Sequence, residues 1–75
     1  MDINEINTQQ IARMREKIKS LREEKGWSVS HLSKISGVSD KTIRNIENGR
    51  NFGILSLFKL CRVYGIKLPD LFGNL

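Results

Sequence analysis

SVSHLSKISGVSDKTIRNIENG, residues 28–49, is a stretch that predicts two short helices joined by a tight turn. Ser28 and Ser39 are of a residue type that caps helix N-termini, and apolar side chains follow each of them at helical spacing. Gly37, between the two helices, can adopt the left-handed backbone that ends a helix without steric cost. This layout is typical of a helix-turn-helix, whose second helix enters the major groove of DNA.

Three further helices are predicted around this motif, over residues 8–25, 54–64 and 68–72. Residues 1–7 are expected to form a flexible N-terminal arm, and residues 8–75 a single domain. The fourth helix carries a wide apolar stripe, which predicts that this helix is the central one: Ile54, Leu57, Phe58, Cys61 and Tyr64, widened by Leu55, Leu60 and Val63. The predicted fold class is therefore all-α, with five helices around one core.

The composition is strongly basic. The 75 residues carry 13 Lys and Arg against 8 Asp and Glu, a formal net charge of +5, and the isoelectric point is about 9.8. In so short a chain this balance favours a polyanionic partner, although a merely basic soluble protein would share it. With 39% hydrophobic residues, the chain is expected to fold as one small globular domain.

The sequence carries no pattern typical of a membrane protein or an enzyme. The polar, acidic N-terminal residues lack the apolar segment of a signal peptide, and no apolar run approaches the roughly 20 residues that span a bilayer. We therefore expect a cytoplasmic protein. The one histidine, His31, and the one cysteine, Cys61, do not make up a metal site or a nucleophile–base pair. Cys61 is expected to be a buried structural thiol, and no cofactor or small-molecule ligand is expected.

Two opposite charges fall on inward-facing stripes. Arg22 lies within the apolar stripe of the first helix, and Glu47 lies on the stripe that Ile43 and Ile46 make in the third. Because an unpaired buried charge is costly, these two residues are predicted to form a partly buried ion pair. Two unrelated surface charges are the alternative.

Over roughly residues 11–72 the chain resembles the phage Cro/repressor class of helix-turn-helix proteins, also called the XRE family. The matching segments are Leu21-Arg22-Glu23-Glu24-Lys25-Gly26, Ser28, Leu32, Gly37-Val38-Ser39, Thr42-Ile43, Ile46-Glu47-Asn48-Gly49, Leu57-Phe58-Lys59-Leu60, Gly65-Ile66 and Leu71-Phe72. Their order and spacing carry the resemblance. It implies a lambda-repressor-like fold, a double-stranded DNA partner, and a bridge between Arg22 and Glu47.

Four side chains of the second motif helix are the candidates for base contacts. Lys41 and Arg44 can donate to the two major-groove acceptors of guanine, and Asn45 can pair bidentately with adenine. Asp40 can accept from cytosine, or it can simply favour the positive N-terminus of its helix. A solvated helix face is the alternative for Lys41 and Arg44.

Contacts to the DNA backbone are expected from polar and basic side chains around the motif: Ser28, Ser30, Lys34, Ser39, Thr42, Asn48 and Arg50. Backbone N–H groups at the helix N-termini would add to them. A further basic run lies on the first helix, as a solvated face or as one near the DNA backbone: Arg13, Arg15, Lys17, Lys19 and Lys25.

The expected function is that of a sequence-specific DNA-binding transcriptional regulator, similar to small Cro-like repressors and restriction–modification controller proteins. Because one half-site offers few contacts, a homodimer is expected on DNA. Its interface is predicted at the last helix, unless the side chains belong to the core: Leu68, Leu71, Phe72 and Leu75. The alternative function is an antitoxin that binds a toxin and autoregulates. Charged residues at positions 41, 44 and 50 disfavour a helical interaction domain without DNA binding.

Overall fold

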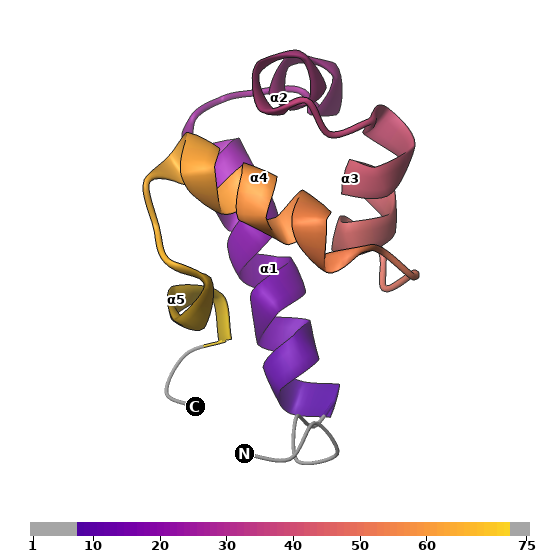
Figure 1. The fold of residues 1–75 in the computed structure, drawn as a ribbon, viewed down its shortest axis with the longest axis vertical. Helices are drawn as coiled ribbons and strands as arrows, with labels where there is room; N and C mark the ends of the chain where they lie inside the picture. Colours follow the sequence, from indigo (N-terminus) through magenta and orange to yellow (C-terminus); the bar gives the residue numbers. More distant parts are fainter. Residues whose placement is uncertain (1–7, 73–75) are drawn as a thin grey trace.

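The computed structural model describes residues 8–72, which fold into five α-helices without a strand (Figure 1). The helices are α1 Thr8–Glu24, α2 Val29–Ser36, α3 Asp40–Glu47, α4 Ile54–Tyr64 and α5 Leu68–Phe72. The predicted all-α fold class is confirmed, and the helices lie where the apolar periodicity predicted them. The arm predicted for residues 1–7 lies outside the described residues, as do Leu75 and the side chain of Phe72.

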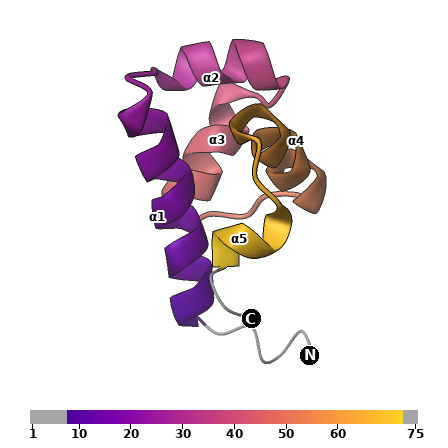
Figure 2. The same ribbon diagram turned by 90° about the vertical axis from the view of Figure 1, so that its left-hand side faces the viewer.

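The helices enclose one core through contacts that close into a ring. α1 packs against α3 and α5, α2 packs against α3 and α4, and α4 packs against α5. Figure 2 shows α2 across one end of α1 and α5 beside its other end. The buried apolar side chains are Met14, Ile18, Leu32, Val38, Ile43, Ile46, Leu57, Leu60, Cys61 and Leu71. Full burial of one large apolar side chain stabilises the fold by about 1.5–3 kcal/mol.

The prediction that α4 is the central helix was wrong. Leu57 and Leu60 are buried, but Ile54, Leu55 and Phe58 are 56%, 64% and 50% exposed. At about 100° per residue, Phe58 lies on nearly the opposite side of the helix from Leu60. Because α2 and α5 cover only one side of α4, part of its wide apolar stripe remains at the surface.

The helix-turn-helix formed by α2 and α3 has the predicted capping residues. The Ser28 Oγ accepts a hydrogen bond from the His31 N–H (3.0 Å), and the Ser39 Oγ accepts one from the Thr42 N–H (3.1 Å). Gly37 ends α2 in the left-handed conformation, with φ of 77°, a backbone geometry that disfavours residues with a Cβ. These caps satisfy amide groups that each helix start leaves unpaired, so they fix the residues at which α2 and α3 begin.

Cys61 is a buried thiol, as predicted, with 4% of its surface exposed. Burial raises the pKa of this thiol, and the nearby Asp70 carboxylate adds to the effect. The reactive thiolate form is therefore disfavoured. None of the helices between residues 8 and 72 has the length and apolar character needed to cross a membrane.

Candidate nucleic-acid interface

A two-point ion pair fastens the end of α3 to α1. The Arg22 Nε donates to the Glu47 Oε2 (2.8 Å), and its Nη2 donates to Oε1 (2.9 Å). The two side chains are only 15% and 6% exposed. The hydrogen bond to Glu47 raises the pKa of Arg22, against an opposing effect of burial. The pair predicted from two inward-facing charges is thus present, and it fixes α3 from the side that faces the protein.

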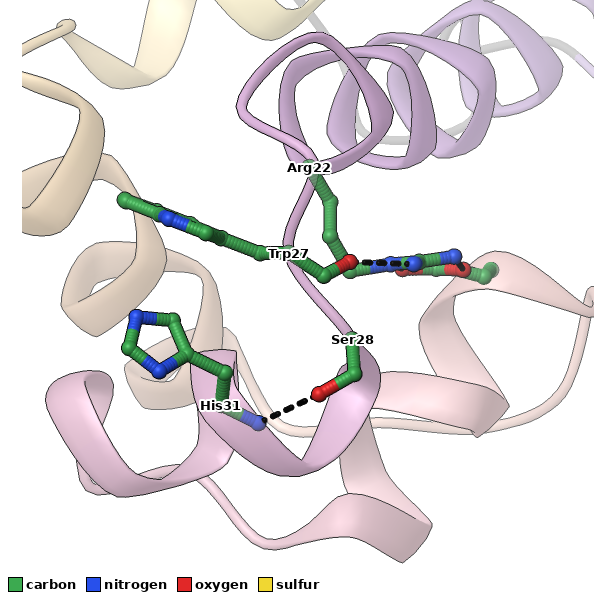
Figure 3. A network of polar contacts seen from close by, with 5 residues as sticks. Arg22, Trp27, Ser28 and His31 are labelled. Atoms are coloured by element: carbon green, nitrogen blue, oxygen red, sulfur yellow. Dashed lines mark hydrogen bonds and ion pairs between the residues drawn. The ribbon is translucent and has the colours of Figure 1, made fainter.

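Arg22 also holds the turn between α1 and α2. Its Nη1 donates to the Trp27 carbonyl oxygen (2.9 Å), a contact visible in Figure 3 beside the Ser28–His31 cap. The Trp27 ring stacks on Tyr64 of α4, with ring centroids 5.9 Å apart, and lies 5.3 Å from His31. One guanidinium therefore joins α1, the turn that precedes α2, and α3.

A second arginine of α1 reaches α3, and sequence reasoning did not single it out. The Arg15 Nη1 donates to the carbonyl oxygens of Asn45 (3.0 Å), Ile46 (2.6 Å) and Arg50 (3.3 Å). Its guanidinium carbon lies 5.4 Å from the centroid of the Phe52 ring. A signal was present, because Arg15 precedes Arg22 by two helical turns and so shares its face of α1.

The side of α3 that faces away from its buried isoleucines is open to solvent. Ile43 and Ile46 are fully buried, whereas Asp40, Lys41 and Arg44 are exposed and Asn45 is half-buried. A hollow of about 490 Å³ lies along this side, lined by Asp40, Lys41, Arg44, Asn45, Asn48 and Arg50. The structure thus brings the four predicted base-reading residues together with two of the predicted backbone-binding residues. Three of these six side chains are basic and one is acidic, so the hollow suits an anionic ligand.

The other predicted backbone contacts lie around α2 and the start of α3. Ser28, Ser30 and Lys34 are exposed but do not line the hollow. Ser39 and Thr42 hydrogen-bond to one another, with 2.9 Å between their hydroxyl oxygens. These two hydroxyls therefore already take part in capping the N-terminus of α3.

The described side chains of the dimer interface predicted on α5 pack in or against the core. Leu71 is 1% exposed and belongs to the core, and Leu68 is half-buried against that core. Leu71 therefore fits the alternative of a core residue. The described residues contain no group of three or more His, Cys, Asp and Glu side chains that could hold a metal ion.

Comparison with known proteins agrees with this geometry. A family model described as "Helix-turn-helix" matches residues 18–71. The "Uncharacterized HTH-type transcriptional regulator YgzD" of Bacillus subtilis (strain 168) is 33% identical over 60 residues, which cover 79% of this chain and 91% of that protein. No solved structure matches the chain significantly. The chain belongs to the XRE family of helix-turn-helix DNA-binding domains.

Proposed function

We propose that this protein is a sequence-specific transcriptional regulator that reads DNA with the exposed side of α3. The observation that carries the proposal is the hollow along α3, where side chains able to read bases adjoin Asn48 and Arg50. Behind it, α3 is fastened by buried isoleucines and by the Arg22–Glu47 pair. A helix held firmly on one side and polar on the other suits insertion into the major groove.

The side chains that line the hollow have different proposed roles, which follow from their chemistry. Lys41 and Arg44 donate to guanine, and Asn45 pairs with adenine. Asp40 either accepts from cytosine or favours the helix N-terminus. Arg50 neutralises a phosphate at the edge of the groove, so it adds affinity without sequence preference. The bound protein then blocks or recruits polymerase, as in Cro-like or controller-type regulators.

Selection from a pool of randomised duplexes tests this proposal. We expect one enriched sequence motif. We also expect the binding constant to fall, for each tenfold increase in salt concentration, by about 0.9 logarithmic units per phosphate contact. The variant Arg44→Gln should lose preference at one base pair. Lys67→Gln is the matched control, because it removes the same charge from an exposed residue between α4 and α5, outside the hollow. Enrichment of no motif, with equal effects of both variants, would refute the proposal.

We further propose that two copies bind one operator, since a single half-site offers few base contacts. The exposed apolar face of α4, made of Ile54, Leu55 and Phe58, is the proposed contact between the copies. It follows the loop that carries Arg50, so a second copy seated there lies beside the bound DNA. Three half-exposed side chains fall well short of the roughly 800 Å² per partner of a stable interface, so we expect association on DNA.

The antitoxin alternative involves a toxin in place of the second copy on the same face of α4. A monomeric complex on DNA that becomes larger only when a second protein is added would favour that alternative. No contact within residues 8–72 favours a toxin, whereas the few base contacts of a single half-site favour a second copy of this chain.

A further inference from the structure

The Arg15 guanidinium lies against the end of α3 and does not line the hollow. Its Nη1 donates to three carbonyl oxygens, those of Asn45, Ile46 and Arg50. Asn45 and Ile46 are in the last turn of α3, and Arg50 is in the loop that follows. The carbonyl groups of a last helical turn lack partners within the helix and carry partial negative charge, so an arginine is well suited to this position.

The Asn45 carbonyl oxygen links the helix end to the loop. It accepts hydrogen bonds from the Arg15 guanidinium (3.0 Å) and from the Arg50 N–H (2.8 Å). The Phe52 ring, further along the loop, lies beside the same guanidinium at 5.4 Å, close enough for a cation–π contact. Asn45 and Arg50 both line the hollow along α3. One side chain of α1 therefore restrains the backbone of two residues at the proposed DNA-binding surface.

We propose that Arg15 is a positioning residue for DNA binding, which holds Asn45 and Arg50 in register with each other. The inference rests on the proposed function and extends it to a residue of α1 outside the helix-turn-helix. Arg15 acts through the backbone of the end of α3 and needs no contact with a base. Lysine cannot replace it fully, because its ammonium group is more strongly hydrated and lacks the planar guanidinium that lies over the Phe52 ring.

Without Arg15, α3 should remain in place but its last turn and the loop should become less well positioned. The buried isoleucines and the Arg22–Glu47 pair still hold the helix. The carbonyl groups of Asn45, Ile46 and Arg50 would lose a restraint, although the Arg50 N–H still bonds to Asn45. Base reading and phosphate binding both require side chains held within a fraction of an ångström. We therefore expect weaker DNA binding from a protein that is still folded.

The variants Arg15→Met and Lys67→Met provide the test. Lys67 is exposed between α4 and α5 and lies outside the hollow, so both changes remove one positive charge but only one of them is next to α3. For the duplex selected by the wild-type protein, we expect Kd to rise about tenfold for Arg15→Met and less than twofold for Lys67→Met. Arg15→Lys should recover part of the loss. The measurements are made well below the thermal midpoint of each variant, so that all of the protein is folded.

Two further readouts separate positioning from general destabilisation. In an Arg50→Ala background, Arg15→Met should raise Kd only about threefold, because residues that act through one another are not additive. Without DNA, hydrogen exchange at the Arg50 amide, which bonds to the Asn45 carbonyl oxygen, should be faster in Arg15→Met and unchanged in Lys67→Met.

Equal Kd values for the two methionine variants, or fully multiplicative effects of Arg15→Met and Arg50→Ala, would overturn the Arg15 proposal alone. A wild-type protein that selects no duplex would overturn the proposed function and the role of Arg15 with it.

Discussion

Arg22 of α1 and Glu47, the last residue of α3, meet through two parallel hydrogen bonds of 2.8 and 2.9 Å, with most of both side chains buried. A planar guanidinium facing a carboxylate in this way restricts both distance and angle. The pair therefore orients α3 relative to the first helix, in addition to any stability it contributes. Neither residue of the pair lines the hollow that Lys41 and Arg44 line.

Breaking this pair should destabilise the fold. Arg22→Met leaves the Glu47 carboxylate buried without its partner, and we expect the free energy of unfolding to fall by about 3 kcal/mol. The double variant Arg22→Met, Glu47→Leu should recover most of that loss, because no charge stays buried. Urea unfolding followed by Trp27 fluorescence measures both. A loss below about 0.5 kcal/mol for Arg22→Met would mean that solvent stabilises Glu47 and that the pair is unimportant.

Base-reading and phosphate-binding residues should differ in their effects on DNA binding. Replacing Lys41, Arg44 or Asn45 with alanine should remove discrimination at one base pair, at about 1–3 kcal/mol. Replacing Arg50 or Lys34 should weaken binding to all sequences nearly equally and lower the salt slope by about one unit. Binding to matched and mutated operators across a salt series distinguishes these outcomes. Unchanged base preference in all three alanine variants would show that α3 is not the reading helix.

Tyr64 should make the fold sensitive to alkali. Its hydroxyl is buried without a hydrogen-bond partner in the described structure, and burial, with the Glu47 charge, raises its pKa to about 12. An unfolded tyrosine loses its proton near pH 10 while the folded one keeps it, so stability should fall between about pH 10 and 12.

The variant Tyr64→Phe tests this pH dependence. It lacks the titrating group and the unpaired hydroxyl, so it should lose less stability over that pH range and be no less stable than the wild type at pH 7. Tyr64 is the chain's one tyrosine, so tyrosinate absorbance reports its ionisation directly. Titration near pH 10 in the folded protein would contradict the prediction.

The apolar face of α4 should matter only for the assembly on DNA. Leu55→Glu and Phe58→Glu place a charge at exposed positions, so folding should be unaffected while binding of the second copy is lost. On a duplex with two half-sites about 34 Å apart, sedimentation should change from two protein copies to one. Lys67→Glu is the control, because Lys67 is exposed in the loop between α4 and α5. If both α4 variants still bind as two copies, the interface lies elsewhere.

The local pattern alone predicted the helices and most of the α3 surface. Capping serines, a glycine in the left-handed conformation and apolar spacing act over a few residues, so they can be identified without knowledge of the fold. The same reasoning predicted that Lys41, Arg44 and Asn45 share the side of α3 that faces away from its buried isoleucines, where they line the hollow. The Arg22–Glu47 pair could also be inferred, since both charges interrupt apolar stripes.

Packing between helices decided the rest. Phe58 and Leu71 both lie on apolar stripes in the sequence, yet Phe58 is half exposed and Leu71 belongs to the core. Which apolar side is covered depends on where neighbouring helices lie, and periodicity within one helix carries no such information. In the sequence, Arg15 is one of several basic residues of the first helix, and nothing in the local pattern distinguishes its partners. Its bonds to the backbone of α3 and the following loop exist because the tertiary fold brings the end of α3 within reach of its side chain.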